Sequence, residues 1–171
     1  MIEKLVAATR ARRDPDLVLI ARTDAIASEG FETALARACA YEAAGADVTY
    51  VEAPRTAEEM AAIPAAMEKP CLIDMVEGGL TPLLPAPEIE KMGYRVALYA
   101  NFALRIASQA VERGLSVLRE TGTSASLLDE MFTWEERQET VGFSDWEAFD
   151  TKIVEEARRV LDDDEAKEGE Q

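Results

Sequence analysis

The sequence contains no histidine and no long apolar run, and each absence excludes a class of function. Without histidine it has neither the side chain that titrates near neutral pH nor the commonest metal ligand, so any chemistry must rest on carboxylates, arginine or a thiol. No run of about 18 apolar residues occurs, and the opening residues Met1-Ile2-Glu3-Lys4 lead into no apolar signal core. We therefore expect a soluble, cytoplasmic protein that does not bind membranes.

Basic residues are also scarce. Lysine and arginine number 18 against 34 acidic residues, which gives a net charge of -16, and only five of the 18 are lysines. A phosphate backbone is bound through clustered lysine and arginine, so nucleic acid is excluded as a partner. Such a surface suits a high-salt cytoplasm, where salt screens self-repulsion, but an ordinary acidic bacterial protein would look the same.

Cysteine is rare as well, with Cys39 and Cys71 alone, each inside an apolar stretch. A free thiol in such a setting behaves as a small hydrophobe, so we expect no disulfide. With 171 residues, 48% of them apolar, the chain is long enough for one domain with a sizeable core and a tail.

Short apolar, β-rich runs alternate with segments of helical character. The runs read as strands buried on both faces and cover 17–21, 47–51, 71–73 and 94–100. The helical segments between and after them cover 31–45, 56–68, 86–93 and 102–121. Strands separated by helices of this length predict parallel βα units, and therefore an α/β fold.

The rest of the chain carries no strand signal. Residues 127–162 look helical and contain aromatic residues that should dock on an apolar surface, whereas the acidic segment from 162 has almost nothing to bury. We therefore expect three regions: βα units over 1–126, a helical segment over 127–161 and a disordered tail over 162–171. Trp134 and Trp146 are interpreted as core or interface aromatics rather than as stacking platforms.

Polar residues follow each expected strand, where ligands bind in parallel α/β folds. They are Arg22, Glu52, Asp74, and Asn101 with Arg105 one turn later. Together they suit a small acid with more than one carboxylate, held bidentately by arginine, and a hard divalent cation on the oxygens. The alternative is that these charges merely cap helices or pair with each other. Gly78-Gly79 is interpreted as a tight turn rather than a phosphate loop.

Several ordered blocks resemble those of the isocitrate lyase and phosphoenolpyruvate mutase superfamily. The blocks are Ala21-Arg22-Thr23-Asp24-Ala25, Glu42-Ala43-Ala44-Gly45-Ala46-Asp47, Val51-Glu52-Ala53, Met75 to Pro82, and Leu98-Tyr99-Ala100-Asn101 with Arg105. The resemblance implies a (β/α)8 TIM-type barrel of which this chain is the C-terminal half, Mg²⁺ dependence, and a homo-oligomer, a tetramer in the family, with C-terminal helices exchanged between subunits. It also assigns substrate contacts to Arg22, Glu52 and Arg105.

The sequence departs from the family pattern at two positions. Asp74 stands where relatives usually have asparagine, so a like charge replaces a neutral donor to an anionic substrate. Binding would weaken unless Asp74 is protonated or faces the metal. Trp134 is the nearest match to the arginine that holds a second carboxylate in methylisocitrate lyases. Tricarboxylate substrates are therefore disfavoured relative to smaller oxo or hydroxy acids.

The family's Asp-rich metal-binding segment and its Lys-x-Cys-Gly-His catalytic loop are not found in this sequence, and neither cysteine replaces the catalytic one. We therefore expect no catalytic residue and no direct metal ligand here. The first hypothesis is the substrate-binding half of a Mg²⁺-dependent carbon-carbon lyase acting on small 2-oxo or 2-hydroxy acids, with a complementing N-terminal half. A phosphonomutase acting on a phosphonate is one alternative. A catalytically incomplete half-barrel that self-associates as a scaffold or carboxylate binder is another.

Overall fold

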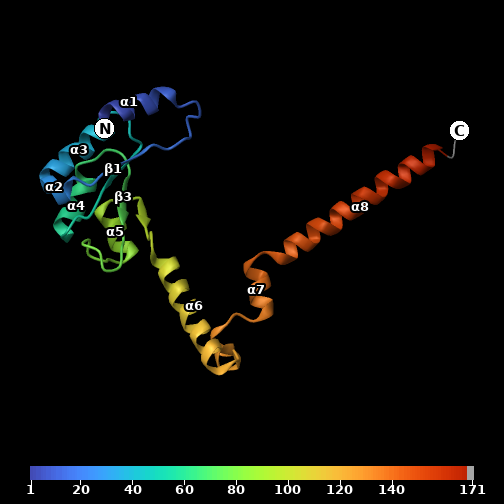
Figure 1. The fold of residues 1–171 in the computed structure, drawn as a ribbon. Coiled ribbons are helices and arrows are strands. Elements are labelled where there is room, and N and C mark those ends of the chain that lie inside the picture. Colours follow the sequence, from blue (N-terminus) through green and yellow to red (C-terminus); the bar gives the residue numbers. More distant parts are fainter. Residues whose placement is uncertain (169–171) are drawn as a thin grey trace. The chain divides into compact units, whose positions relative to one another are not determined.

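The computed structural model describes residues 1–168 and divides the chain into two compact units, Met1–Gln109 and a second that begins at Ala110 (Figure 1). Among the described residues, no helix is both long and apolar enough to cross a bilayer.

The first unit contains one sheet of four parallel strands in sequence order. Its strands are β1 (Ile20–Thr23), β2 (Val48–Val51), β3 (Cys71–Asp74) and β4 (Val96–Leu98). This confirms the α/β fold class and the parallel neighbours that the sequence predicts. The predicted start of the first strand at Leu17 is wrong, because the amide of Leu17 donates to the carbonyl of Asp14 in a turn. The strand therefore begins three residues later.

One helix precedes the first strand of this unit, and the others follow strands, as expected for βα units. They are α1 (Ile2–Ala11), α2 (Ala25–Glu29), α3 (Phe31–Ala43), α4 (Ala57–Ala65) and α5 (Ala86–Met92). The Thr56 hydroxyl accepts a hydrogen bond from the amide of Glu59 and so caps the start of α4. Gly93 ends α5 in the left-handed conformation, with φ of 107°, which a residue without a Cβ adopts without strain. The sequence thus encodes these helix ends locally.

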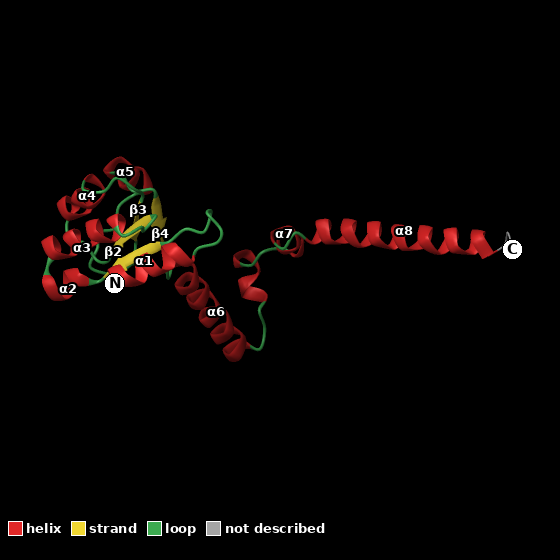
Figure 2. Cartoon of the chain, turned by 90° about the horizontal axis from the view of Figure 1, so that it is seen from above, coloured by secondary structure: helices red, strands yellow, loops and turns green. Residues whose placement is uncertain are grey.

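The two faces of the sheet differ in burial. Figure 2 shows the strands together within the first unit, with α3, α4 and α5 on one side. Ile73 of β3 points to that side and packs with Met60 and Ile63 of α4 in the main apolar cluster. On the other face, Ile20 of β1 and Val96 of β4 are 53% and 40% exposed. The prediction that every strand is buried on both faces is therefore wrong for the two outer strands.

The second unit, which begins at Ala110, is helical. Its elements are the later turns of α6 (Phe102–Thr121), a 3-10 helix (Ala125–Glu130), α7 (Trp134–Thr140) and α8 (Phe143–Glu168). Thr133 and Glu136 form a capping box that starts α7. Residues 162–168 continue α8, although the sequence predicts disorder there, because each residue added to a formed helix gains a backbone hydrogen bond. Residues 169–171 of the expected tail lie outside the described residues.

Large apolar side chains of the second unit are exposed. Trp134 is 69% exposed and Trp146 is 68% exposed, and Trp146 meets Phe149 edge to face at 6.2 Å between ring centroids. Leu127 is buried against α6, where it lies near Gly114 and helps to line an apolar groove. The aromatic residues of α7 and α8 therefore contribute little to the core of their own unit.

Candidate functional site

The site lies at the carboxyl ends of β1, β2 and β3, on the sheet face opposite the helices. Arg22 pairs in register with Tyr50, and Asp74 ends β3. Because side chains alternate along a strand, Arg22, Tyr50 and Asp74 project to the face opposite the one that carries Ala21, Val51 and Ile73. Glu52 follows β2 two residues after Tyr50 and so shares its direction.

The hydroxyl of Tyr50 is the centre of this site. It donates a short hydrogen bond to Glu52 Oε2, accepts one from Arg22 Nη1 at 3.2 Å, and lies 3.2 Å from Asp74 Oδ2. The Arg22 guanidinium also lies 3.2 Å from Glu52 Oε2 and stands over the Tyr50 ring, 4.8 Å from its centroid. Three strands thus bring one arginine, one phenol and two carboxylates into direct contact.

Asp24 completes the surroundings of Arg22. Its Oδ1 accepts from Arg22 Nη2 at 2.7 Å and from Arg22 Nε at 3.1 Å, and this bond is the largest reason that the pKa of Arg22 is raised. The Arg22 side chain is 46% exposed and that of Asp24 is 66% exposed. A solute can therefore reach the guanidinium, and Asp24 can turn into solvent to release the two donors that it holds.

Burial is the main cause that raises the pKa of Tyr50, and the hydrogen bond to Glu52 adds to it. The phenol therefore keeps its proton throughout the physiological range and acts as a hydrogen-bond donor. Ala53, the residue directly after Glu52, adopts φ of 57°. A residue with a Cβ is strained in this left-handed region, and such strain often accompanies functional sites.

The other two predicted site residues lie beside a different partner. Arg105, on the first turn of α6, donates from Nη1 to the carbonyl of Glu77 at 2.7 Å and lies 3.7 Å from Glu77 Oε2. Asn101 is exposed, and its carbonyl accepts from the amide of Arg105. The structure therefore brings Arg22, Glu52 and Asp74 together, and it records no contact from Arg105 or Asn101 to that group.

Tyr50 is the residue that reasoning from the sequence missed. Its sequence context indicates only a residue of the apolar strand 47–51, because tyrosine is common in buried strands. The available signal was its position two residues before Glu52, which places both side chains on one face.

The oxygen atoms of this group match the donors that Mg²⁺ prefers. Asp74 Oδ1 is buried and accepts no hydrogen bond from residues 1–168. Within the same residues, however, no three of the side chains His, Cys, Asp and Glu converge as a metal site. Asp74 and Glu52 could therefore contribute oxygens to a cation that waters or a substrate also hold, but they form no complete protein cage.

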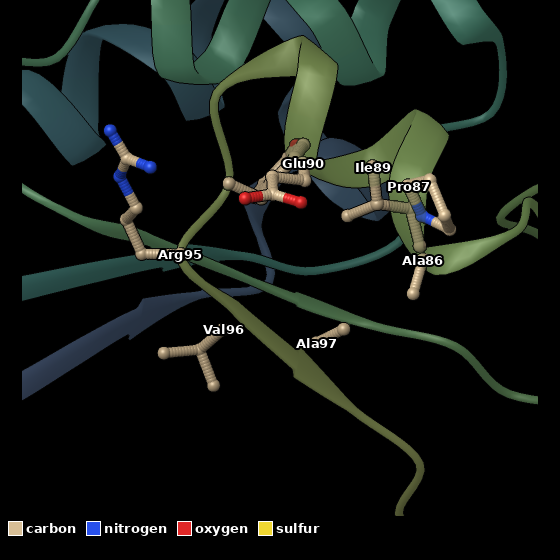
Figure 3. A pocket seen from close by; sticks show the side chains of 8 residues that line it. Ala86, Pro87, Ile89, Glu90, Arg95, Val96 and Ala97 are labelled. Atoms are coloured by element: carbon tan, nitrogen blue, oxygen red, sulfur yellow. The ribbon is translucent and has the colours of Figure 1, made fainter.

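A separate hollow of about 300 Å³ lies between α5 and β4. Figure 3 shows Ile89, Ala86 and Ala97 along it, with Glu90 and Arg95 at one end. It shares no residue with the group formed by Arg22, Tyr50, Glu52 and Asp74, here called the Arg22 group. Its lining is mostly apolar, which suits packing of another apolar segment better than binding of a small acid.

Comparison with known proteins identifies the family. The family model for phosphoenolpyruvate phosphomutase matches residues 1–119, which include every residue of the Arg22 group. The chain belongs to this family. The sequence blocks predicted a member of the isocitrate lyase and phosphoenolpyruvate mutase superfamily, and this match confirms the prediction.

Individual members of the family are similar over most of this chain. The 2,3-dimethylmalate lyase of Eubacterium barkeri is 37% identical over 142 residues, which are 83% of this chain and 49% of the relative. Oxaloacetate acetylhydrolase in complex with its product oxalate has a TM-score of 0.80 and 34% identity over 89% of this chain and 53% of its own.

Phosphonopyruvate hydrolase in complex with oxalate and Mg²⁺ has a TM-score of 0.75 and 29% identity, covering 90% of this chain and 56% of its own. The chain spans about half the length of the relatives and solved structures that it matches.

Proposed function

We propose that this chain supplies the substrate-binding side of a Mg²⁺-dependent carbon-carbon lyase that acts on small 2-oxo or 2-hydroxy carboxylic acids. The observation that carries the proposal is the half-exposed Arg22 guanidinium, held at the carboxyl end of the sheet by Tyr50 and Glu52. Its lyase relative and two oxalate complexes support a carboxylate ligand for a site of this kind.

Arg22 would bind the substrate carboxylate through its planar fork of donors. Asp24 now accepts from Nε and Nη2, the two donors that a bidentate carboxylate would use, and its exposure lets the substrate replace it. Tyr50 and Glu52 keep the guanidinium in place during that exchange, because they contact Nη1 and Nη2 respectively. The same positive charge would stabilise an enolate-like oxyanion as the carbon-carbon bond breaks.

When bound, Mg²⁺ would polarise the substrate oxygens and neutralise developing negative charge. Glu52 and Asp74 are the carboxylates of this chain that would lie next to it, directly or through water.

A phosphonomutase is a second candidate, because the matching family model is that of a phosphomutase and an arginine fork binds phosphonate as well as carboxylate. We further propose that the chain assembles with a complementing half-barrel or with copies of itself. The strands β1 and β4 each pair with one neighbour among residues 1–168, and unpaired strand edges favour association. Association without catalysis would leave a carboxylate-binding scaffold.

The test combines binding with turnover. Oxalate would be titrated into the full chain by calorimetry with and without Mg²⁺. Release of 2-oxo acids from malate, dimethylmalate and methylisocitrate would be followed as phenylhydrazones, loss of oxaloacetate would be followed by its own absorbance, and conversion of phosphonopyruvate would probe the second candidate. We expect Mg²⁺-dependent oxalate binding that Arg22→Lys weakens about tenfold, because lysine cannot reproduce the bidentate fork.

Arg37→Lys is the matched control, since Arg37 makes a similar paired contact with Glu29 away from the site. It should leave oxalate affinity unchanged. Absence of oxalate binding together with absence of product from every acid would refute the lyase proposal. Oxalate binding without any turnover, also after a complementing N-terminal half is added, would support the carboxylate-binding scaffold instead.

A further inference from the structure

The hydroxyl of Tyr50 has one proton and two carboxylate neighbours. Glu52 Oε2 is the closer acceptor, and Asp74 Oδ2 lies farther away at 3.2 Å. Arg22 Nη1 already donates into the phenol oxygen. Because a phenol donates a single hydrogen bond, Glu52 takes the proton and Asp74 Oδ2 receives at best a minor share of it.

Unlike Oδ2, the second oxygen of Asp74 has no donor within the described residues. Asp74 Oδ1 is buried and accepts no hydrogen bond from the part of the chain that the structure describes. A buried acceptor without a donor is costly, since it has given up water and gained nothing in return. The carboxylate of Asp74 is thus only partly used as an acceptor, through Oδ2, and it lies on the same sheet face as Arg22.

We infer that Asp74 accepts a hydrogen bond from a hydroxyl of the substrate, so that the site favours a 2-hydroxy acid over the 2-oxo acid of the same carbon skeleton. This inference rests on the proposed function, because it assumes that Arg22 holds the substrate carboxylate. A hydroxyl donates to a carboxylate. A keto oxygen has only lone pairs and is repelled by one, whereas an asparagine amide at this position would donate to it.

The experiment measures binding of three four-carbon dicarboxylic acids to the full chain by calorimetry, with Mg²⁺ present. Malate carries a hydroxyl at C2, oxaloacetate a keto oxygen and succinate neither. We expect malate to bind about tenfold more tightly than succinate, and oxaloacetate more weakly than succinate, because a hydrogen bond to a charged group is worth that factor. Asp74→Asn should reverse the order of malate and oxaloacetate.

Asp16→Asn is the matched control, because it makes the same chemical change in the loop before β1 and should preserve the order. Circular dichroism would check that each variant is folded. If Asp74→Asn does not fold, the malate to oxaloacetate ratio of the unsubstituted chain still decides. Equal binding of the two acids overturns the inference and leaves the proposed function standing.

Two further outcomes count against the inference. Tight binding of Mg²⁺ alone that Asp74→Asn abolishes would overturn it and leave the proposed function standing, because Asp74 would then bind the cation directly instead of the substrate hydroxyl. Failure of the unsubstituted chain to bind any of the three acids would remove the proposed function and this inference together.

Discussion

Asp47 offers a stability test that is independent of the ligand. Its Oδ2 accepts from Arg12 Nη1 at 2.6 Å and from the amide of Leu19 at 2.8 Å, and Arg12 Nη1 also donates to the carbonyl of Leu17 at 2.9 Å. One carboxylate thus joins the end of α1, the loop before β1 and the start of β2. Asp47→Asn keeps the shape and removes the charge.

The expected loss is about 2 kcal/mol. A hydrogen bond to a charged group contributes about 1.5–3 kcal/mol, but exposed ion pairs contribute only about 0–1 kcal/mol. The side chains of Arg12 and Asp47 are 20% and 32% exposed, so two partly buried bonds fall between these limits. At about 2–4 °C per kcal/mol, the melting temperature should fall by roughly 4–8 °C at neutral pH.

The pH dependence has a definite sign. The Leu19 amide is the largest cause that lowers the pKa of Asp47, and Arg12 adds to it. A carboxylate whose pKa is lowered by folding stabilises the folded state at pH values above its unfolded pKa of about 4. This stabilisation is lost as the pH falls from that unfolded pKa through the lower folded pKa. The difference between the unsubstituted chain and Asp47→Asn should therefore shrink below about pH 4.

Thermal unfolding followed by far-ultraviolet circular dichroism would measure this difference, and hydrogen exchange would locate it in residues 12–23. Asp16→Asn is again the control, because the hydrogen bond of Asp16 uses only its backbone amide, which donates to Asp14 Oδ1 and does not depend on the charge of the Asp16 side chain. Equal melting temperatures for the two chains at neutral pH, with unchanged exchange in residues 12–23, would refute the reasoning.

Two more predictions concern the backbone and assembly. Ala53→Gly should raise the free energy of unfolding by about 1 kcal/mol and Ala53→Val should lower it, because φ of 57° strains residues with a Cβ. Denaturant unfolding measures both changes, and equal effects of the two substitutions would contradict the strain. Light scattering across protein concentration should show an oligomer, because exposed apolar surface associates. Trp146→Glu should weaken this oligomer, and high salt should strengthen it by screening the net charge of -16. A monomer at every protein concentration would contradict the prediction.

The sequence by itself determined the fold class and most of the element order. Apolar strand runs, the Thr56 cap and the Gly93 stop are local features, and their alternation requires parallel βα units. The same reasoning placed Arg22, Glu52 and Asp74 at one end of the sheet, because the carboxyl ends of parallel strands share an edge.

Tertiary structure alone decided which polar groups touch. The strand register sets Arg22 beside Tyr50, and the phenol then links Glu52 to Asp74 across three strands. A strand pattern gives the direction of a side chain but not the partner that another strand brings, since the register depends on packing of the whole sheet. The contact of Arg105 with Glu77 rather than with Arg22 was undetermined by the sequence for the same reason.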